Sequence, residues 1–159
     1  SITDYLTLHG DWGNVLRLLE FMDKFFGSEG LDTLWPSERN ALDSNLAAAY
    51  ISTGRFDGAK KILEEQVKRC RDCYSDYRNL AWLYFREAQF EEAETWLLKG
   101  LKKGPDQFQS LELLGDIKAS LGKRGEAIDA YKKAMNLTTD PLRKERIEQK
   151  MKLIPSPRP

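Results

Sequence analysis

The chain has 159 residues with 25 basic and 25 acidic side chains, so its formal net charge is zero. This balance argues against nucleic acid as a partner, because a surface built to bind a phosphate backbone carries an excess of positive charge. No apolar run approaches the roughly 20 residues that a membrane helix needs, so we expect no membrane contact by this chain. We also expect a cytoplasmic location. The chain starts at Ser1 within a helical pattern, and an N-terminal segment with a membrane anchor could precede it.

Residues 1–26 predict a divergent or truncated helical repeat unit. Residues 2–9 read as the end of one helix, and a second helix with apolar side chains at helical spacing follows the turn at Gly10 and ends near Phe26. Residues 27–39 form an insertion or connection before the next unit. It is too apolar for a free loop, and we expect its side chains to pack over the first units, with a partner surface as the alternative: Phe25, Phe26, Leu31, Leu34 and Trp35.

Three segments of 34 residues follow one pattern: 40–73, 74–107 and 108–141. When the three segments are aligned one above another, three of the aligned columns hold small residues and two hold bulky residues. We expect each segment to be a pair of helices that must stack on its neighbours to bury its apolar face. The helices are predicted at about 36–53, 56–70, 74–87, 90–103, 108–121 and 124–137. The columns are Ala59, Ala93, Ala127; Ala47, Ala81, Gly115; Gly54, Ala88, Gly122; Leu46, Leu80, Leu114; and Leu63, Leu97, Tyr131.

A last helix is predicted at 142–154, opened by Asp140 as N-cap and Pro141 at the first helical position. One narrow apolar stripe and an otherwise charged surface are what a capping helix needs, because the last repeat would otherwise expose the face that awaits a neighbour. Residues 155–159 should be a flexible tail. The stripe consists of Leu142, Ile147, Met151 and Ile154.

The middle segment carries the residues of a known repeat pattern: Tyr77, Leu80, Ala81, Tyr84, Ala93, Leu97 and Pro105. On these residues the chain resembles the tetratricopeptide repeat (TPR) family. Four positions depart from the pattern, with Asp43 in place of an aromatic residue, Lys118 in place of a tyrosine, and Gln66 and Gly100 in place of alanine. The resemblance implies an all-α fold, a right-handed α-α superhelix or TPR solenoid with a C-terminal capping helix.

The resemblance also implies a protein–protein interaction scaffold or adaptor, and members serve bacterial envelope, secretion or polysaccharide-export assemblies. In the family the first helix of each unit lines the concave, partner-binding face. Aromatic side chains mixed with guanidinium groups are typical of binding hot spots, although Trp82 could instead be buried between units. The implied partner-binding residues are Arg78, Asn79, Trp82, Phe85, Arg86, Gln109, Glu112 and Asp116, with Ser44 and Ala48 in the first segment.

A familiar TPR ligand, the acidic C-terminus of heat-shock chaperones, is not expected. The basic and amide side chains that clamp it would fall at Ser44, Ala48, Asn79, Gln109 and Leu113, and of these only Asn79 fits. The alternative to a scaffold is a self-associating structural module, that is, a homo-oligomer.

The sequence offers little for catalysis, so we expect no enzyme and no cofactor. His9 is its single histidine, and it contains no glycine-rich phosphate loop. Cys70 and Cys73 could form half a zinc site, a redox pair or a disulfide. A metal or redox accessory that uses this pair is the most distant alternative, since the chain has no further cysteine to complete a zinc site.

Overall fold

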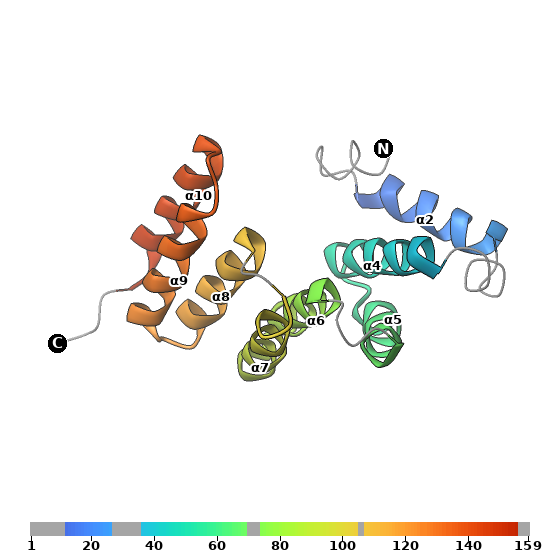
Figure 1. Ribbon diagram of the computed structural model, residues 1–159, viewed down its shortest axis with the longest axis horizontal. Coiled ribbons are helices and arrows are strands. Elements are labelled where there is room, and N and C mark those ends of the chain that lie inside the picture. The colour runs from blue at the N-terminus through green and yellow to red at the C-terminus, as the bar shows by residue number, and fades with distance from the viewer. Residues whose placement is uncertain (1–11, 27–35, 70–73, 105–106, 156–159) are drawn as a thin grey trace. The chain divides into compact units, whose positions relative to one another are not determined.

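The structure is a computed structural model that describes residues 12–26, 36–69, 74–104 and 107–155. Every regular element within these ranges is an α-helix (Figure 1). From the repeat at 74–107 onward, each repeat helix ends one or two residues before its predicted end. The helices are α2 (Trp12–Phe26), α4 (Pro36–Ser52), α5 (Phe56–Arg69), α6 (Tyr74–Arg86), α7 (Phe90–Leu101), α8 (Phe108–Ser120), α9 (Arg124–Asn136) and α10 (Pro141–Leu153).

The chain divides into two compact units, unit 1 up to Asn79 and unit 2 from Leu80 onward. In unit 1, α4 packs against α2 and α5. Leu16 of α2 lies buried with Leu42 and Leu46 of α4. Glu20 of α2 accepts hydrogen bonds from the Tyr50 hydroxyl at 3.1 Å and from Arg55 at 3.0 Å. Apolar and polar contacts together therefore fix α2 on the helices that follow it.

In unit 2 two buried apolar clusters meet along α8. The first joins Ala81 of α6 and Ala93 of α7 to Ile117 of α8. The second joins Phe108 of α8 to Tyr131 of α9 and Ile147 of α10. Because α8 contributes to both clusters, it links α6 and α7 on one side to α9 and α10 on the other (Figure 1).

The repeated columns of small residues have two different physical causes. Ala59, Ala93 and Ala127 are fully buried, as the close approach of paired helices requires. In contrast, Gly54 and Gly122 have φ values of 77° and 72°, and an added Cβ would meet nothing within 4 Å at either. That column marks the left-handed turn between the two helices of each repeat. Ala88 holds the same conformation, with a φ of 59°, despite its side chain.

Polar side chains fill three of the four positions that depart from the repeat pattern. Buried Asp43 pairs with Arg69 at 2.8 Å. Lys118, also buried, lies between the carboxylates of Glu94 and Glu126 and pairs with both. Two of the four departures, Asp43 and Lys118, are therefore matched by charged partners on neighbouring helices.

The capping helix α10 begins as predicted, since the Asp140 side chain accepts a hydrogen bond from the Leu142 amide at 3.0 Å. Ile147 and Ile154 are buried and Met151 packs against the same cluster. The prediction for Leu142 is wrong: it is 75% exposed. Leu142 lies in the first turn of the helix, and the buried side of α10 starts further along at Ile147.

Several predictions fall outside the described residues, among them those for the 27–35 insertion, for His9 and for the cysteine pair at 70 and 73. Of the insertion's predicted apolar surface, the structure describes the side chain of Phe25, which is 71% exposed and stacks on Phe21 with ring centroids 5.8 Å apart. Among the helices described, none has the length and apolar character to cross a membrane.

Candidate partner-binding site

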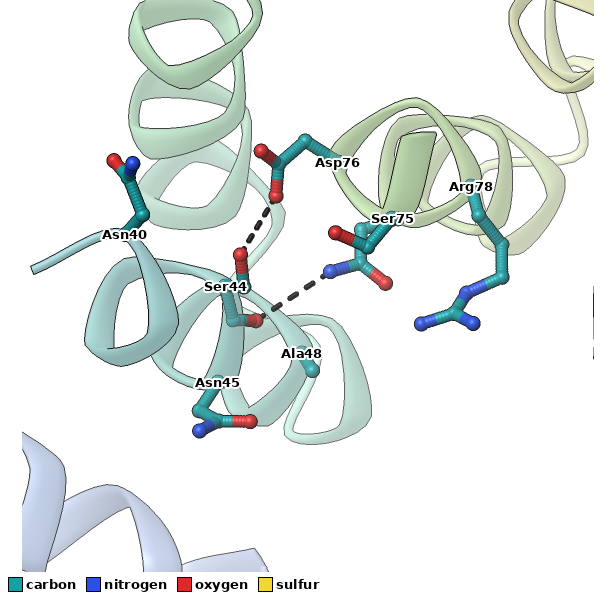
Figure 2. A pocket seen from close by; sticks show the side chains of 8 residues that line it. Asn40, Ser44, Asn45, Ala48, Ser75, Asp76 and Arg78 are labelled. Atoms are coloured by element: carbon teal, nitrogen blue, oxygen red, sulfur yellow. Dashed lines mark hydrogen bonds between the residues drawn. The ribbon is translucent and has the colours of Figure 1, made fainter. Parts of the chain in front are cut away.

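A pocket of about 340 Å³ lies in unit 1 between one face of α4 and the first turns of α6 (Figure 2). Asn40, Ser44 and Ala48 recur every four residues on α4, so they share one face of that helix. The walls consist mainly of amide and hydroxyl side chains, with one carboxylate and one guanidinium group. The lining residues are Asn40, Ser44, Asn45, Ala48, Ser75, Asp76, Arg78 and Asn79.

Hydrogen bonds from α4 and α5 hold this pocket in shape. The Ser44 hydroxyl donates to Asp76 Oδ1 at 2.6 Å, and Asn79 Nδ2 donates to the Ser44 carbonyl at 3.5 Å (Figure 2). From α5, buried Gln66 donates to the Ser44 hydroxyl oxygen at 3.3 Å and to the Asn40 carbonyl at 3.0 Å. Ser44 is therefore the point where the three helices of the pocket are joined.

Two charged groups lie on different sides of the pocket. Burial raises the pKa of Asp76, and nearby Asp43 raises it further, while the Ser44 hydrogen bond, Arg69 and Arg78 partly oppose the shift. Burial also lowers the pKa of Arg78, against the influence of Tyr74 and Asp76. Figure 2 shows the Arg78 side chain directed away from Asp76. The pocket thus offers a negative and a positive end to a bound group.

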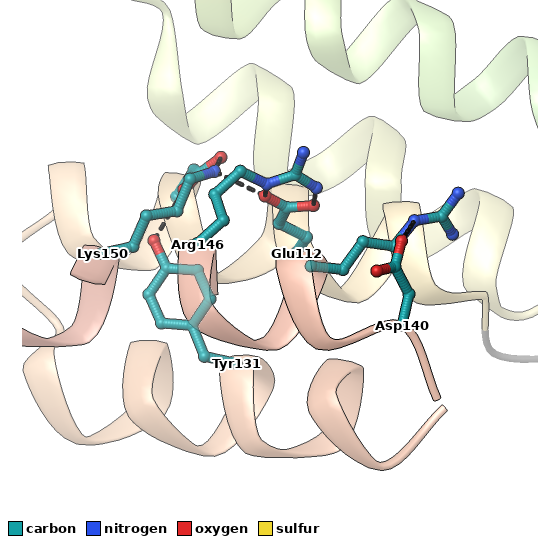
Figure 3. A network of polar contacts seen from close by, with 7 residues as sticks. Glu112, Tyr131, Asp140, Arg146 and Lys150 are labelled. Atoms are coloured by element: carbon teal, nitrogen blue, oxygen red, sulfur yellow. Dashed lines mark hydrogen bonds and ion pairs between the residues drawn. The ribbon is translucent and has the colours of Figure 1, made fainter. Parts of the chain in front are cut away.

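In unit 2 two of the polar residues predicted for the partner-binding face of α8, Glu112 and Asp116, contact α10 (Figure 3). Glu112 accepts from Arg146 at 2.8 Å and from Lys150 at 2.8 Å. Asp116 accepts from Lys150 at 2.8 Å and from the Tyr131 hydroxyl at 2.6 Å. Burial and the hydrogen bond to Asp116 raise the pKa of Tyr131. Burial by itself would lower the pKa of Lys150. Its bonds to Asp116 and Glu112 outweigh this effect and raise the pKa above the ordinary value.

The structure therefore separates the predicted partner-binding residues into groups. Arg78 and Asn79 line the pocket of unit 1. Trp82 and Phe85 are half-buried against the first cluster of unit 2. Arg86 and Gln109 are exposed, whereas Glu112 and Asp116 are held in ion pairs by α10. Binding of a partner by these residues stays a prediction.

Two features of the site were missed by sequence reasoning, and both left a signal. The pocket residues Asn40, Asn45, Ser75 and Asp76 show in the sequence as small polar side chains near Ser44 and just before Arg78. The ion pairs of α10 show as opposite charges one repeat length apart, because Arg146 follows Glu112 by 34 residues and Lys150 follows Asp116 by 34.

A second hollow of about 320 Å³ lies in unit 2 where α10 ends. Phe85, Leu153 and Ile154 line it together with Asp116 and Lys150. Since those two charges already pair with each other, mainly apolar surface is left for a ligand. Within the described ranges, no three histidine, cysteine, aspartate or glutamate side chains gather closely enough to hold a metal ion.

Helix pairs in a 34-residue register, short left-handed turns and a polar closing helix define an all-α helical-repeat protein. Residues 44–72 and 108–141 each match a family description that reads tetratricopeptide repeat. These two segments of the chain are therefore tetratricopeptide repeats, as the sequence predicts. Proteins of this family are in general non-catalytic and bind protein partners.

Solved structures share this fold. One holds nearly identical TPR-like repeats assigned to a kinesin light chain of Podosopora anserina, with a TM-score of 0.64 and 19% identity over 94% of this chain and 80% of that one. Another, named MamA MSR-1, has a TM-score of 0.59 and 21% identity over 94% of this chain and 83% of that one. These likenesses confirm the TPR-solenoid fold expected from the sequence. No curated protein sequence matches the chain significantly.

Proposed function

We propose that this chain is a protein–protein interaction scaffold that holds an extended peptide segment of its partner in the pocket of unit 1. Support comes first from the family, whose members bind proteins, and second from the pocket itself. Its volume of about 340 Å³ is sufficient for one or two residues of a peptide. A cytoplasmic location stays a hypothesis. Service in an envelope, secretion or polysaccharide-export assembly also stays a hypothesis, and it rests on the resemblance alone.

The amide and hydroxyl lining of the pocket is the observation that carries this proposal. Each asparagine side chain offers both donors and an acceptor, and each serine hydroxyl offers both functions in one atom. An extended peptide presents backbone N–H and C=O groups in alternation, and those groups must find partners when they are buried. Asn45 is exposed on α4, so its amide is well placed to reach such a backbone.

The experiment is selection from a display library of random short peptides, followed by affinity measurements on the selected sequences. Asn45→Ala should weaken binding about tenfold, which corresponds to about 1.4 kcal/mol for one lost hydrogen bond. Asn136→Ala is the matched control, because Asn136 is an exposed asparagine at the end of α9 in the other unit. The melting temperature of both variants should match that of the parent protein.

Two results would contradict the proposal. One is that selection enriches no peptide. The other is that Asn45→Ala and Asn136→Ala bind the selected peptides as tightly as the parent protein does, which would place binding outside this pocket.

A further inference from the structure

We infer that the pocket of unit 1 selects partner segments that bring a cationic side chain, lysine or arginine, to the carboxylate of Asp76. The inference rests on the proposed function, since it names the chemistry of the partner for that same pocket. It goes further in predicting which side chain the partner must present and at which side of the pocket.

Asp76 combines deep burial with a position in the pocket wall. Its exposed fraction is 1%. Within the described part of the chain, its side-chain hydrogen bond comes from Ser44 and ends on Oδ1, at 2.6 Å. The other carboxylate oxygen, Oδ2, receives no hydrogen bond from the described residues, so it retains the capacity to accept from a ligand.

A buried carboxylate is costly unless a positive group or several donors compensate for its lost hydration. The neighbouring cations do this only in part. Arg69 already pairs with Asp43 at 2.8 Å, and Arg78 extends away from Asp76 in Figure 2. Burial remains the largest influence on Asp76 and raises its pKa, which is the direction expected where compensation is incomplete. An ammonium or guanidinium group of a partner would supply the missing charge.

The Asp76 carboxylate in the pocket wall also favours a basic partner over an acidic one. An acidic group placed in the pocket would meet the Asp76 carboxylate at close range, where the effective dielectric constant is low and repulsion is strong. Arg78, on the other side, can then hydrogen-bond a carbonyl or carboxylate further along the same segment, which fixes the direction of the bound peptide.

The test compares peptide selection on the parent protein, on Asp76→Asn and on Glu64→Gln. Asparagine keeps the size of the side chain and an oxygen that can accept from Ser44, so Asp76→Asn removes the charge alone. Glu64→Gln removes an exposed carboxylate of α5 in the same unit and serves as control. The parent protein and the control should enrich lysine or arginine at one fixed position, and Asp76→Asn should lose this preference.

A selected peptide then supplies a second readout on the unaltered protein, which does not depend on whether Asp76→Asn folds. Replacing its lysine by norleucine removes the charge and keeps the aliphatic chain. We expect this exchange to weaken binding to the parent protein at least about tenfold and to leave binding to Asp76→Asn nearly unchanged.

The inference and the proposed function fail in different ways. Enriched peptides without a basic position, or a norleucine peptide that binds as well as the lysine peptide, would overturn the inference and leave the scaffold function standing. If no peptide is enriched at all, both are overturned.

Discussion

At the scale of single residues, the third repeat shows how one substitution depends on another. Its fifth column holds Tyr131 where the first two repeats hold leucine, and Gly115 stands where they hold alanine. A Cβ added to Gly115 would lie 2.4 Å from Cε1 of Tyr131, which is closer than side chains approach. The tyrosine ring therefore occupies the volume of the missing methyl group, and the two residues form one packing unit.

This pairing predicts a strong coupling between the two positions. Gly115→Ala should lower the free energy of unfolding by about 1 to 3 kcal/mol, because the added methyl group forces the ring or the helix to move. In a Tyr131→Leu background the same change should cost much less, since leucine leaves the room that the other repeats give their alanine. Urea denaturation of the two single variants and the double variant measures the coupling. Equal costs of Gly115→Ala in both backgrounds would show that the ring does not limit this position.

At the scale of helices, most of the fold could be predicted because the repeat supplies the same information three times. The alanine at 59 recurs at 93 and 127, and each copy lies fully buried in the structure. Helix ends could be predicted for a local reason, since Gly54 and Gly122 adopt a backbone conformation that disfavours other residues. These signals lie within a few residues of the element that they define.

What could not be predicted depends on which helices lie opposite each other. Lys118 was noted only as a poor substitute for tyrosine, because its partner Glu94 is 24 positions away on another helix. Glu112 was assigned to an open binding face, whereas α10 lies across it and supplies Arg146 and Lys150. In the pocket of unit 1, Asp76 becomes notable only through its burial and its bond to Ser44, and neither can be read from its sequence neighbours.

The helix α10 occupies the place of a first helix in a fourth repeat. Its ion pairs to α8 keep the 34-residue offset. The positions that would face a second helix of its own repeat correspond to the buried Tyr77, Leu80 and Ala81 of the middle repeat. In α10 they carry exposed polar residues, which need no further helix to cover them: Glu145, Glu148 and Gln149.

Ile147 should therefore account for much of the stability that α10 adds to unit 2. It is fully buried in the cluster with Phe108 and Tyr131. Ile147→Ala should lower the free energy of unfolding by about 2 to 5 kcal/mol, through lost burial and the cavity that remains. Glu148→Ala, at the next and exposed position, is the control and should change stability by less than about 0.5 kcal/mol. Similar denaturation midpoints for these two variants would mean that α10 is not docked as described.

At the scale of the whole molecule, the neutral chain is made of two oppositely charged units. Residues 1–79 carry a net charge of minus three, and residues 80–159 carry fifteen basic and twelve acidic side chains, a net charge of plus three. Opposite charges on two copies attract, so the asymmetry supports the alternative of a self-associating module. The attraction is weak for exposed groups, and salt screens it over about 8 Å at physiological ionic strength.

We therefore expect concentration-dependent association at low salt that disappears as salt is raised, measured by sedimentation velocity. Unit 2 supplies a direct control, because Lys144 and Lys152 of α10 lie outside the ion pairs with α8. Lys144→Glu combined with Lys152→Glu changes the charge of unit 2 from plus three to minus one and should abolish association while α10 stays folded. A strict monomer at high concentration and low salt would exclude the self-associating module. Association that persists at high salt would instead indicate apolar contact, for which the stacked rings of Phe21 and Phe25, 62% and 71% exposed, are the first residues to change.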